Sequence, residues 1–146
     1  MNRFLQSAAV MALVAFSAPA AAETLRGTLY KDPNCPCCEG HAAYLKERGI
    51  ELDIEPVENI AMFSRAAGIP SAYLGCHTIL LDGYVIEGHI NLELIQRLLR
   101  ERPADVVGIS LPGMPTGVPG MGGPYDGPYD VYAIKKNGTA TVFAVQ

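Results

Sequence analysis

The feature that most constrains the fold is a cysteine motif, Cys35-Pro36-Cys37-Cys38, which lies between a strand-like and a helix-like stretch. The preceding residues 24–30, TLRGTLY, alternate in polarity and are rich in β-forming residues, which predicts a strand. Residues 37–48 carry apolar side chains at helical spacing, and Gly49 follows as a stop signal. Cys35 and Cys38 therefore have the C-x-x-C spacing of a redox dithiol at a helix start, where the helix dipole favours a thiolate.

The chain continues in alternating strand and helix patterns as far as residue 103. The expected elements are a strand at 50–57, a helix at 58–68, strands at 76–81 and 84–88, and a helix at 91–103. Asp82-Gly83 is a hairpin signal between the last two strands, and Asn91 is a candidate N-cap for the last helix. The order β-α-β-α-β-β-α, with a dithiol after the first strand, predicts the α/β class and a thioredoxin-like domain.

The composition changes after Pro103. Within residues 112–128, 11 of 17 residues are glycine or proline, which excludes a helix or a central strand there. Two strand-like pieces follow, on either side of an Asn137-Gly138 turn signal. We therefore expect a Gly/Pro/Met-rich loop at 103–130 and a C-terminal β-hairpin at 131–146 that adds to one edge of the structure.

The first 22 residues have the pattern of a cleaved secretory signal peptide. Arg3 supplies a positive charge, an apolar run covers residues 8–16, and small residues precede Glu23. The apolar run is too short to span a bilayer, so we expect cleavage after Ala22. No other stretch is apolar for long enough to span a membrane, so no membrane segment is expected after cleavage. The remaining residues 23–146 would form one domain with 10 basic and 15 acidic residues, which argues against nucleic acid as a partner.

All four cysteines lie in this remaining part of the chain, and three of them are clustered. Two structural disulfides would be a poor framework, because only one of the three can pair with the distant Cys76 and a Cys35–Cys38 bridge closes a very small loop. A Cys35–Cys38 redox disulfide remains open as an interpretation. Clustered thiols in an exported protein indicate a redox site or a metal site.

The expected fold brings Cys76 to the other three cysteines. In thioredoxin-fold enzymes a cis-proline that faces the dithiol stands just before the third strand, and here Cys76-His77 occupies roughly that place. Four thiols could then converge as soft ligands for Cu(I) or zinc. Met114 and Met121 lie in the Gly/Pro-rich loop, where thioethers are expected to be exposed, and thioethers favour copper over zinc. Met62, at helical spacing among apolar residues, is expected in the core.

The three histidines are secondary metal-ligand candidates. His41 follows the cysteine motif by about one helical turn and is expected to face solvent. His77 should point to the face opposite Cys76 if the strand is regular there, unless the strand begins only after them. His89 lies at the end of the strand at 84–88.

Three sequence motifs in this order resemble an exported, copper-associated family of the CopG type. The motifs are NCPCC, GCHTILLDGYVIEGHI and PGMPTGVPGM followed by YDVYAI. The resemblance implies a thioredoxin-like periplasmic protein tied to copper resistance, whose partners are copper ions and other periplasmic copper-resistance or redox proteins. It also implies that Cys35, Cys37, Cys38 and Cys76 bind copper, in the form of a polynuclear copper–thiolate cluster, and that the protein interconverts Cu(I) and Cu(II). Family members often have glycine where this chain has Pro36.

Three functions are therefore compared with the structure. The first is a periplasmic copper-binding protein of copper resistance that is redox-active on Cu(I)/Cu(II), with Met114 or Met121 completing the site. The second is a thiol–disulfide oxidoreductase, with Cys35 as nucleophile and Cys38 as resolving thiol. The third is a passive module that sequesters zinc or copper. Whether the protein turns over as an enzyme, as a copper oxidoreductase, is left open by the sequence.

Overall fold

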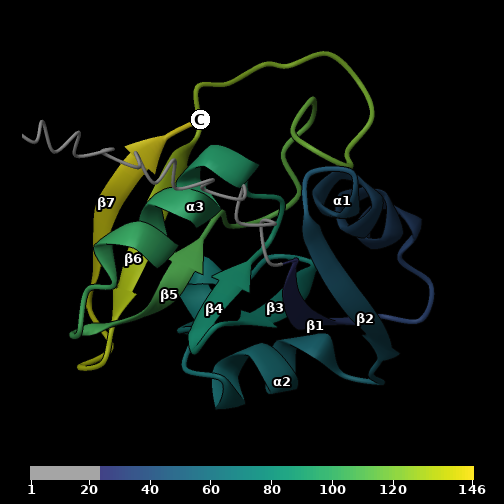
Figure 1. The fold of residues 1–146 in the computed structure, drawn as a ribbon. Helices are drawn as coiled ribbons and strands as arrows, with labels where there is room; N and C mark the ends of the chain where they lie inside the picture. The colour runs from purple at the N-terminus through teal and green to yellow at the C-terminus, as the bar shows by residue number, and fades with distance from the viewer. Residues whose placement is uncertain (1–23) are drawn as a thin grey trace, which may run out of the picture.

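A computed structural model describes residues 24–146 of the chain. The predicted signal peptide at 1–22 lies outside the described residues. The described part is a mixed α/β structure with three α-helices, one short 3₁₀ helix and a single seven-stranded sheet (Figure 1).

The sheet has the strand order β2-β1-β3-β4-β5-β6-β7. Its strands are β1 (Leu25–Lys31), β2 (Ile50–Pro56), β3 (His77–Leu81), β4 (Tyr84–Glu87), β5 (Val106–Ser110), β6 (Asp130–Lys135) and β7 (Ala140–Val145). The pairs β1–β2 and β4–β5 are parallel, whereas β1–β3, β3–β4, β5–β6 and β6–β7 are antiparallel. β1 and β3 are therefore neighbours inside the sheet, and the cysteine motif follows the end of β1.

Helices cover both faces of the sheet. The helices are α1 (Pro36–Lys46), α2 (Ile60–Ala66) and α3 (Leu92–Glu101). α1 and α3 lie on one face and contribute Leu45, Ile95 and Leu98 to the main core, while α2 lies on the other face (Figure 1). The alternation along β3 agrees with this arrangement, since Ile79 belongs to the main core whereas the hydroxyl of Thr78 is 2.7 Å from that of Ser64 in α2.

Local signals in the sequence correctly mark two of these elements. Asp82 and Gly83 both have positive φ, 48° and 84°, which is the conformation of a tight hairpin turn between β3 and β4. The side chain of Asn91 accepts a hydrogen bond from the Leu94 backbone N–H and caps α3 as expected. The prediction for Met62 was wrong, because its side chain is 61% exposed on α2.

The expected loop at 103–130 contains a strand that the sequence analysis did not identify. β5 pairs in parallel with β4 and antiparallel with β6, so it joins the C-terminal hairpin β6–β7 to the sheet. A side chain at Gly108 would place its Cβ 1.8 Å from the Val85 carbonyl oxygen, so the close approach of β5 to β4 requires glycine here. The hairpin thus extends one edge of the sheet, and the connecting loop passes α1 before it returns to β6 (Figure 1).

Candidate metal centre

The cysteine motif sits at the start of α1, directly after β1. Cys35 occupies the N-cap position with an extended backbone, and Pro36 takes the first helical position, where no intrahelical hydrogen bond is lost. The structure joins Cys35 to Cys38 in a disulfide, with the two Cα atoms 5.7 Å apart, and leaves Cys37 and Cys76 as free thiols. The C-x-x-C pair at the start of the helix is therefore close enough to form a disulfide.

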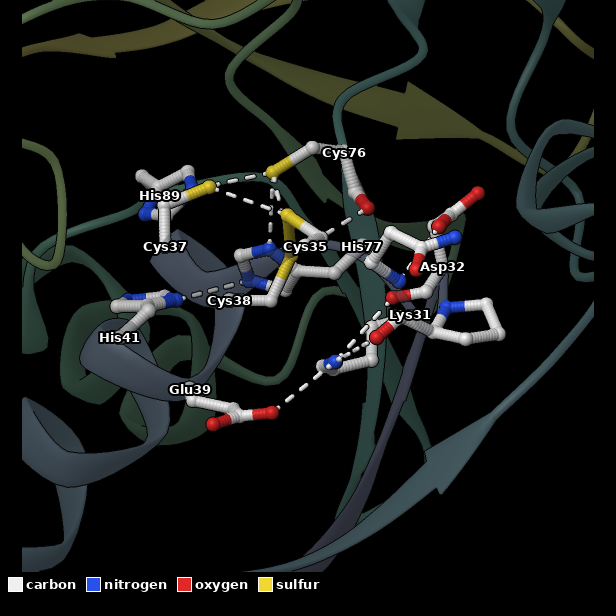
Figure 2. The surroundings of a disulfide bond; sticks show 12 residues. Lys31, Asp32, Cys35, Cys37, Cys38, Glu39, His41, Cys76, His77 and His89 are labelled. Carbon is white, nitrogen blue, oxygen red and sulfur yellow. Dashed lines mark hydrogen bonds and ion pairs between the residues drawn. A yellow bond between two sulfur atoms is a disulfide. The ribbon is translucent and has the colours of Figure 1, made fainter.

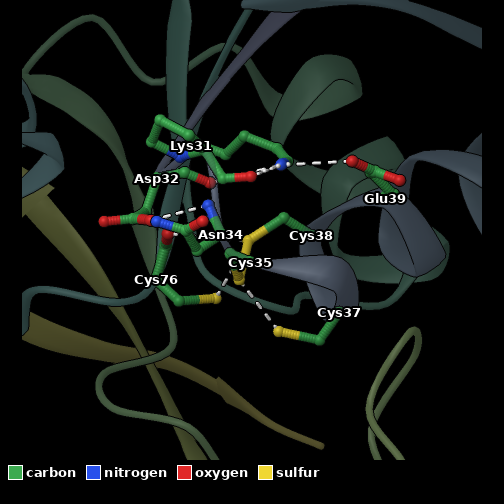
Figure 3. Close-up of polar contacts among 9 residues, drawn as sticks. Lys31, Asp32, Asn34, Cys35, Cys37, Cys38, Glu39 and Cys76 are labelled. Carbon is green, nitrogen blue, oxygen red and sulfur yellow. Dashed lines mark hydrogen bonds and ion pairs between the residues drawn. A yellow bond between two sulfur atoms is a disulfide. The ribbon is translucent and has the colours of Figure 1, made fainter. Parts of the chain in front are cut away.

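All four cysteine sulfur atoms converge, and they lie within 4.8 Å of one another. Cys76 comes from the segment just before β3, and its Sγ is 3.7 Å from the Sγ of Cys38. The Cys37 thiol donates a hydrogen bond of 3.1 Å to Cys35 Sγ. Figure 3 shows the four sulfur atoms grouped between the start of α1 and the Cys76 segment. The thiols that sequence reasoning placed together are thus together in the fold.

An open pocket of about 470 Å³ lies over this sulfur group. Cys35, Cys37 and Cys76 line it, and so do both methionines of the Gly/Pro-rich loop, Met114 and Met121. Met114 is 57% exposed, whereas Met121 is half-buried and packs against the core. The pocket therefore presents thiol and thioether sulfur from three separate segments of the chain, which is a soft donor set.

The three histidines form a buried cluster beside the sulfur atoms (Figure 2). His41, His77 and His89 are all 0% exposed, so the prediction that His41 faces solvent was wrong. β3 begins at His77, and Cys76 precedes the regular strand, which lets both side chains reach the centre. One signal could have identified His41: it lies three residues after Cys38, on the same face of α1.

The hydrogen bonds of His41 and His77 fix which ring nitrogens carry protons. His41 Nε2 lies 2.9 Å from the Ile90 carbonyl oxygen and must donate to it, because a carbonyl only accepts. In a neutral ring His41 Nδ1 then accepts, and His77 Nε2–H donates to it over 2.9 Å. The remaining nitrogen, His77 Nδ1, is unprotonated and lies 3.3 Å from Cys76 Sγ.

His89 presents a second unprotonated nitrogen to the same sulfur. Its Nδ1–H donates to the Pro119 carbonyl oxygen at 2.8 Å, so Nε2 carries the lone pair, 3.0 Å from Cys76 Sγ. A backbone carbonyl on the far nitrogen is the usual way in which proteins orient a metal-ligating imidazole. The Cys76 sulfur atom therefore contacts both the cysteine cluster and the histidine cluster.

Burial keeps the Cys76 thiol and the three histidines uncharged in the metal-free state. It raises the pKa of the Cys76 thiol to about 12, and the neighbouring Cys37 adds to this shift. Burial also lowers the pKa of His41 to about 4 and holds the pKa values of His77 and His89 below the usual value. A cation that binds Cys76 must therefore displace a proton, and two neutral imidazoles lie beside that sulfur.

A buried carboxyl group holds the backbone on both sides of Cys76 and His77. Glu87 is 0% exposed, and its Oε1 accepts from the Gly75 backbone N–H at 2.8 Å. Its Oε2 accepts from the Thr78 hydroxyl at 2.7 Å. Burial raises the pKa of Glu87. Because these contacts bracket Cys76 and His77, Glu87 orders the segment that supplies one cysteine and one histidine.

Glycine residues let the Gly/Pro-rich loop, which carries Met114 and Met121, pack on α1 close to the cysteines. Gly120 has φ of 81°, and a Cβ there would lie 2.4 Å from the His41 backbone nitrogen. A Cβ on Gly40 would meet the Gly120 carbonyl oxygen at 3.0 Å. Two facing glycines thus allow backbone-to-backbone contact, and Met121 follows directly on the loop side.

The end of the C-terminal hairpin reaches the same region. The Gln146 side-chain amide donates to the His89 carbonyl oxygen at 2.9 Å and accepts from the Asn91 backbone N–H at 2.9 Å. The hairpin therefore supports the backbone that carries His89, although sequence reasoning assigned it no role at the site.

The buried histidines predict an acid-sensitive fold in the metal-free protein. The folded pKa of His41 is lowered from 6.5 to about 4, so between these values the unfolded chain binds a proton that the folded chain does not. The free energy of unfolding should then fall as pH drops through this window, by roughly 3 kcal/mol for His41 alone. Urea denaturation at several pH values between about 7 and 4 measures this dependence.

The matched variant for this prediction is His41→Gln, which removes the titrating group. Burial raises the pKa of Glu87, which makes the folded protein more stable as pH falls and so opposes the effect of His41. The test is therefore the difference in pH dependence of stability between the wild type and His41→Gln, not the dependence of either protein alone. The variant should show a shallower loss of stability at low pH. Parallel curves for the two proteins would contradict the role given to His41.

The chain is similar in sequence and in fold to solved structures of known proteins. Two solved structures are similar to the chain, described as "Copper resistance protein copG- Form 2" and "Copper resistance protein copG- Form 1". Each is 32% identical and covers 85% of this chain, with TM-scores of 0.78 and 0.77. The match spans 99% and 98% of those chains, respectively.

Two further comparisons bear on the chain. A family described as "Protein of unknown function, DUF411" matches residues 73–121, which include Cys76, two of the histidines and both loop methionines. No curated protein matches. Within residues 24–146, no helix has the length and apolar character needed to cross a bilayer.

Proposed function

The chain belongs to the CopG-type family of copper-associated proteins, and on that premise we propose that it is a periplasmic copper-resistance protein that binds Cu(I) through its cysteine cluster. Cys35, Cys37, Cys38 and Cys76 are the proposed ligands, and Met114 or Met121 completes the set on the open side. The copper is the cargo of the protein rather than a structural cofactor.

One observation carries this proposal: the four cysteine sulfur atoms lie within 4.8 Å of one another, and three of them share an open pocket with the two loop thioethers. A disulfide exchanger needs only Cys35 and Cys38, and it gains nothing from Cys76 or from loop methionines. Thiolate and thioether together favour Cu(I), and four thiolates in mutual contact can bridge more than one cuprous ion, which supports a polynuclear cluster. His77 Nδ1 and His89 Nε2 are secondary ligand candidates at Cys76, and His41 orients His77.

We propose that the Cys35–Cys38 pair exchanges electrons with the copper. Two Cu(II) ions would each take one electron from the reduced dithiol, giving two Cu(I) ions, one disulfide and two released protons. The reverse reaction would return the dithiol and two Cu(II) ions. The Cys35–Cys38 disulfide, whose Cys35 lines the metal pocket, supports this step, because donor and acceptor then lie in the same site. Because a disulfide cannot supply thiolate ligands, a partner redox protein would be needed to reduce it again, which restores both the dithiol and the four-cysteine Cu(I) site.

The remaining parts of the proposal concern fold and location. The segment from β1 to α3 has the order β-α-β-α-β-β-α and the sheet order β2-β1-β3-β4, which supports a thioredoxin-like unit within one domain at 23–146. Removal of residues 1–22 as a signal peptide would place this domain in the periplasm. There it would meet copper ions and other copper-resistance or redox proteins.

Anaerobic titration of the reduced protein with Cu(I), in competition with a strong chelator, tests the binding function. We expect the protein to take Cu(I) from the chelator and to release protons as the thiols become thiolates. A parallel titration with Zn²⁺ separates copper handling from passive zinc sequestration, because the methionines favour copper. Failure to compete for Cu(I), or a stronger preference for zinc, would contradict the proposal.

The Cys35–Cys38 disulfide at a helix start specifically favours a second function, thiol–disulfide exchange. Insulin reduction without metal measures it directly. Rapid turnover that is unaffected by loss of Cys37 and Cys76 would support this second function over copper handling.

A further inference from the structure

A lysine lies buried beside the cysteine motif, at the end of β1. Lys31 is 3% exposed and alternates with the core residue Leu29, so both side chains point to the face of the sheet that α1 covers. In the sheet register Lys31 is directly opposite His77 of β3. Directly opposed residues in an antiparallel pair share a face, so Lys31 lies on the same side of the sheet as the buried histidine.

The ammonium group of Lys31 contacts the chain on both sides of Cys35 and Cys38. Nζ donates to the Asp32 carbonyl oxygen at 3.2 Å and to the Pro33 carbonyl oxygen at 3.3 Å, both before the motif. It also lies 3.1 Å from Glu39 Oε1, directly after the motif. Figures 2 and 3 show these contacts converging on Nζ from the turn and from α1.

The burial of the Lys31 side chain carries a desolvation cost that its observed contacts do not fully offset. Removing an ammonium group from water is costly, and two backbone carbonyls together with one carboxylate compensate only part of that cost. The Glu39 side chain is itself 62% exposed, so its charge is screened by solvent. An apolar side chain would fill the same position in the core without this cost. Arg26, at the other end of β1, forms its ion pair with Glu51 at the surface instead.

Metal binding by the cysteines would supply further counter-charge. Each ligating cysteine is a thiolate, and a centre with fewer cuprous ions than thiolates carries net negative charge. In a partly buried site this charge favours a nearby fixed cation.

We propose that Lys31 is the resident cation of the copper–thiolate centre: its charge stabilises the loaded, negatively charged state, and its contacts with the turn and with Glu39 hold that charge in place. This inference rests on the proposed copper function and adds a residue to it that ligates no metal. Lys31 is thus a positioning and charge-balancing residue.

The test compares Cu(I) affinity, by anaerobic chelator competition, in four proteins: the wild type, Lys31→Met, Glu39→Gln and the surface control Arg26→Met. Lys31→Met should bind Cu(I) about tenfold more weakly, the effect of one unit charge at a distance on the order of 10 Å and an effective dielectric constant of about 20. Glu39→Gln should bind as tightly as the wild type or more tightly, because it removes a negative charge that offsets Lys31. Arg26→Met should be unchanged.

The outcomes distinguish an effect of the Lys31 charge from structural support of the turn by Lys31. They also distinguish a failure of either role from a failure of the proposed copper function. If Lys31 acted only as a structural brace, Glu39→Gln would weaken binding in the same direction as Lys31→Met, and that result would overturn the inference. Equal affinities for Lys31→Met and Arg26→Met would overturn it as well. If Lys31→Met does not fold, the direction of the Glu39→Gln effect decides, because Glu39 is at the surface. Absence of Cu(I) binding by the wild type would overturn the proposed function and this inference together.

Discussion

Replacement of Cys76 by serine should weaken Cu(I) binding by roughly 100-fold or more, because loss of a direct ligand exceeds the 10- to 100-fold effect typical of outer contacts. Cys76 has the largest expected effect because its Sγ contacts Cys38 Sγ and both unprotonated imidazole nitrogens, those of His77 and His89. Serine keeps the size of the side chain but offers a hard oxygen, which suits Cu(I) poorly. Chelator competition measures the loss.

The same variant distinguishes metal binding from disulfide exchange. Cys76→Ser leaves the Cys35–Cys38 pair intact, so a thiol–disulfide oxidoreductase would keep its insulin-reduction activity and show no linked effect of copper. Met62→Leu is the matched control, since Met62 is an exposed thioether on α2 that does not line the cysteine pocket. Wild-type Cu(I) affinity in Cys76→Ser would remove Cys76 from the ligand set.

Gly120→Ala should both destabilise the protein and weaken copper binding. Alanine at this position meets the His41 backbone nitrogen at 2.4 Å and must also adopt φ of 81°, so either the loop leaves α1 or the helix shifts. We expect a loss of about 1–3 kcal/mol in the free energy of unfolding. We also expect roughly tenfold weaker Cu(I) binding, because Met121 moves with the loop. Urea denaturation and chelator competition measure the two effects.

A neighbouring glycine provides the control for this prediction. Gly122 lies two residues further along the same loop, and a Cβ there would meet no atom within 4 Å. Gly122→Ala should therefore stay within about 0.5 kcal/mol of the wild type. If Gly120→Ala and Gly122→Ala behave alike, the contact between the loop and α1 does not position Met121.

Local sequence signals were sufficient for the turn between β3 and β4 and for the start of α3. The Asp82-Gly83 turn and the Asn91 cap are short-range features, and each depends on the conformational preferences of one or two residues. Placing Cys76 near the other cysteines required only that the expected third strand lie beside the first. The structure pairs β1 directly with β3, which brings the two cysteine-bearing segments together.

β5 could not be recognised in the same way. It has only five residues, follows Pro103 closely and contains Gly108, so its local composition resembles that of the loop after it. Its strand conformation depends on partners far away in sequence, β4 on one side and β6 on the other. Glycine disfavours a strand when the sequence is considered alone, but at position 108 the close approach of the Val85 carbonyl oxygen requires it.

The histidine cluster was underestimated for a related reason. The burial of His41, His77 and His89 depends on the hydrogen bond between His41 and His77 and on the carbonyl oxygens of Ile90 and Pro119, not on any one position alone. Such partners come from the segment between β4 and α3 and from the Gly/Pro-rich loop, and no local pattern reveals them. The buried position of Lys31 also becomes visible only when α1 is packed over β1.

X-ray absorption at the copper edge of the reduced, Cu(I)-loaded protein tests the central claim most directly, because it reports the oxidation state of copper and its ligand atoms together. We predict an edge typical of Cu(I) and a first shell dominated by sulfur, with nitrogen as a minor component from His77 or His89. Copper–copper scattering would indicate a polynuclear cluster. A first shell of nitrogen and oxygen without sulfur would contradict the account, since the four cysteines would then not be the copper ligands.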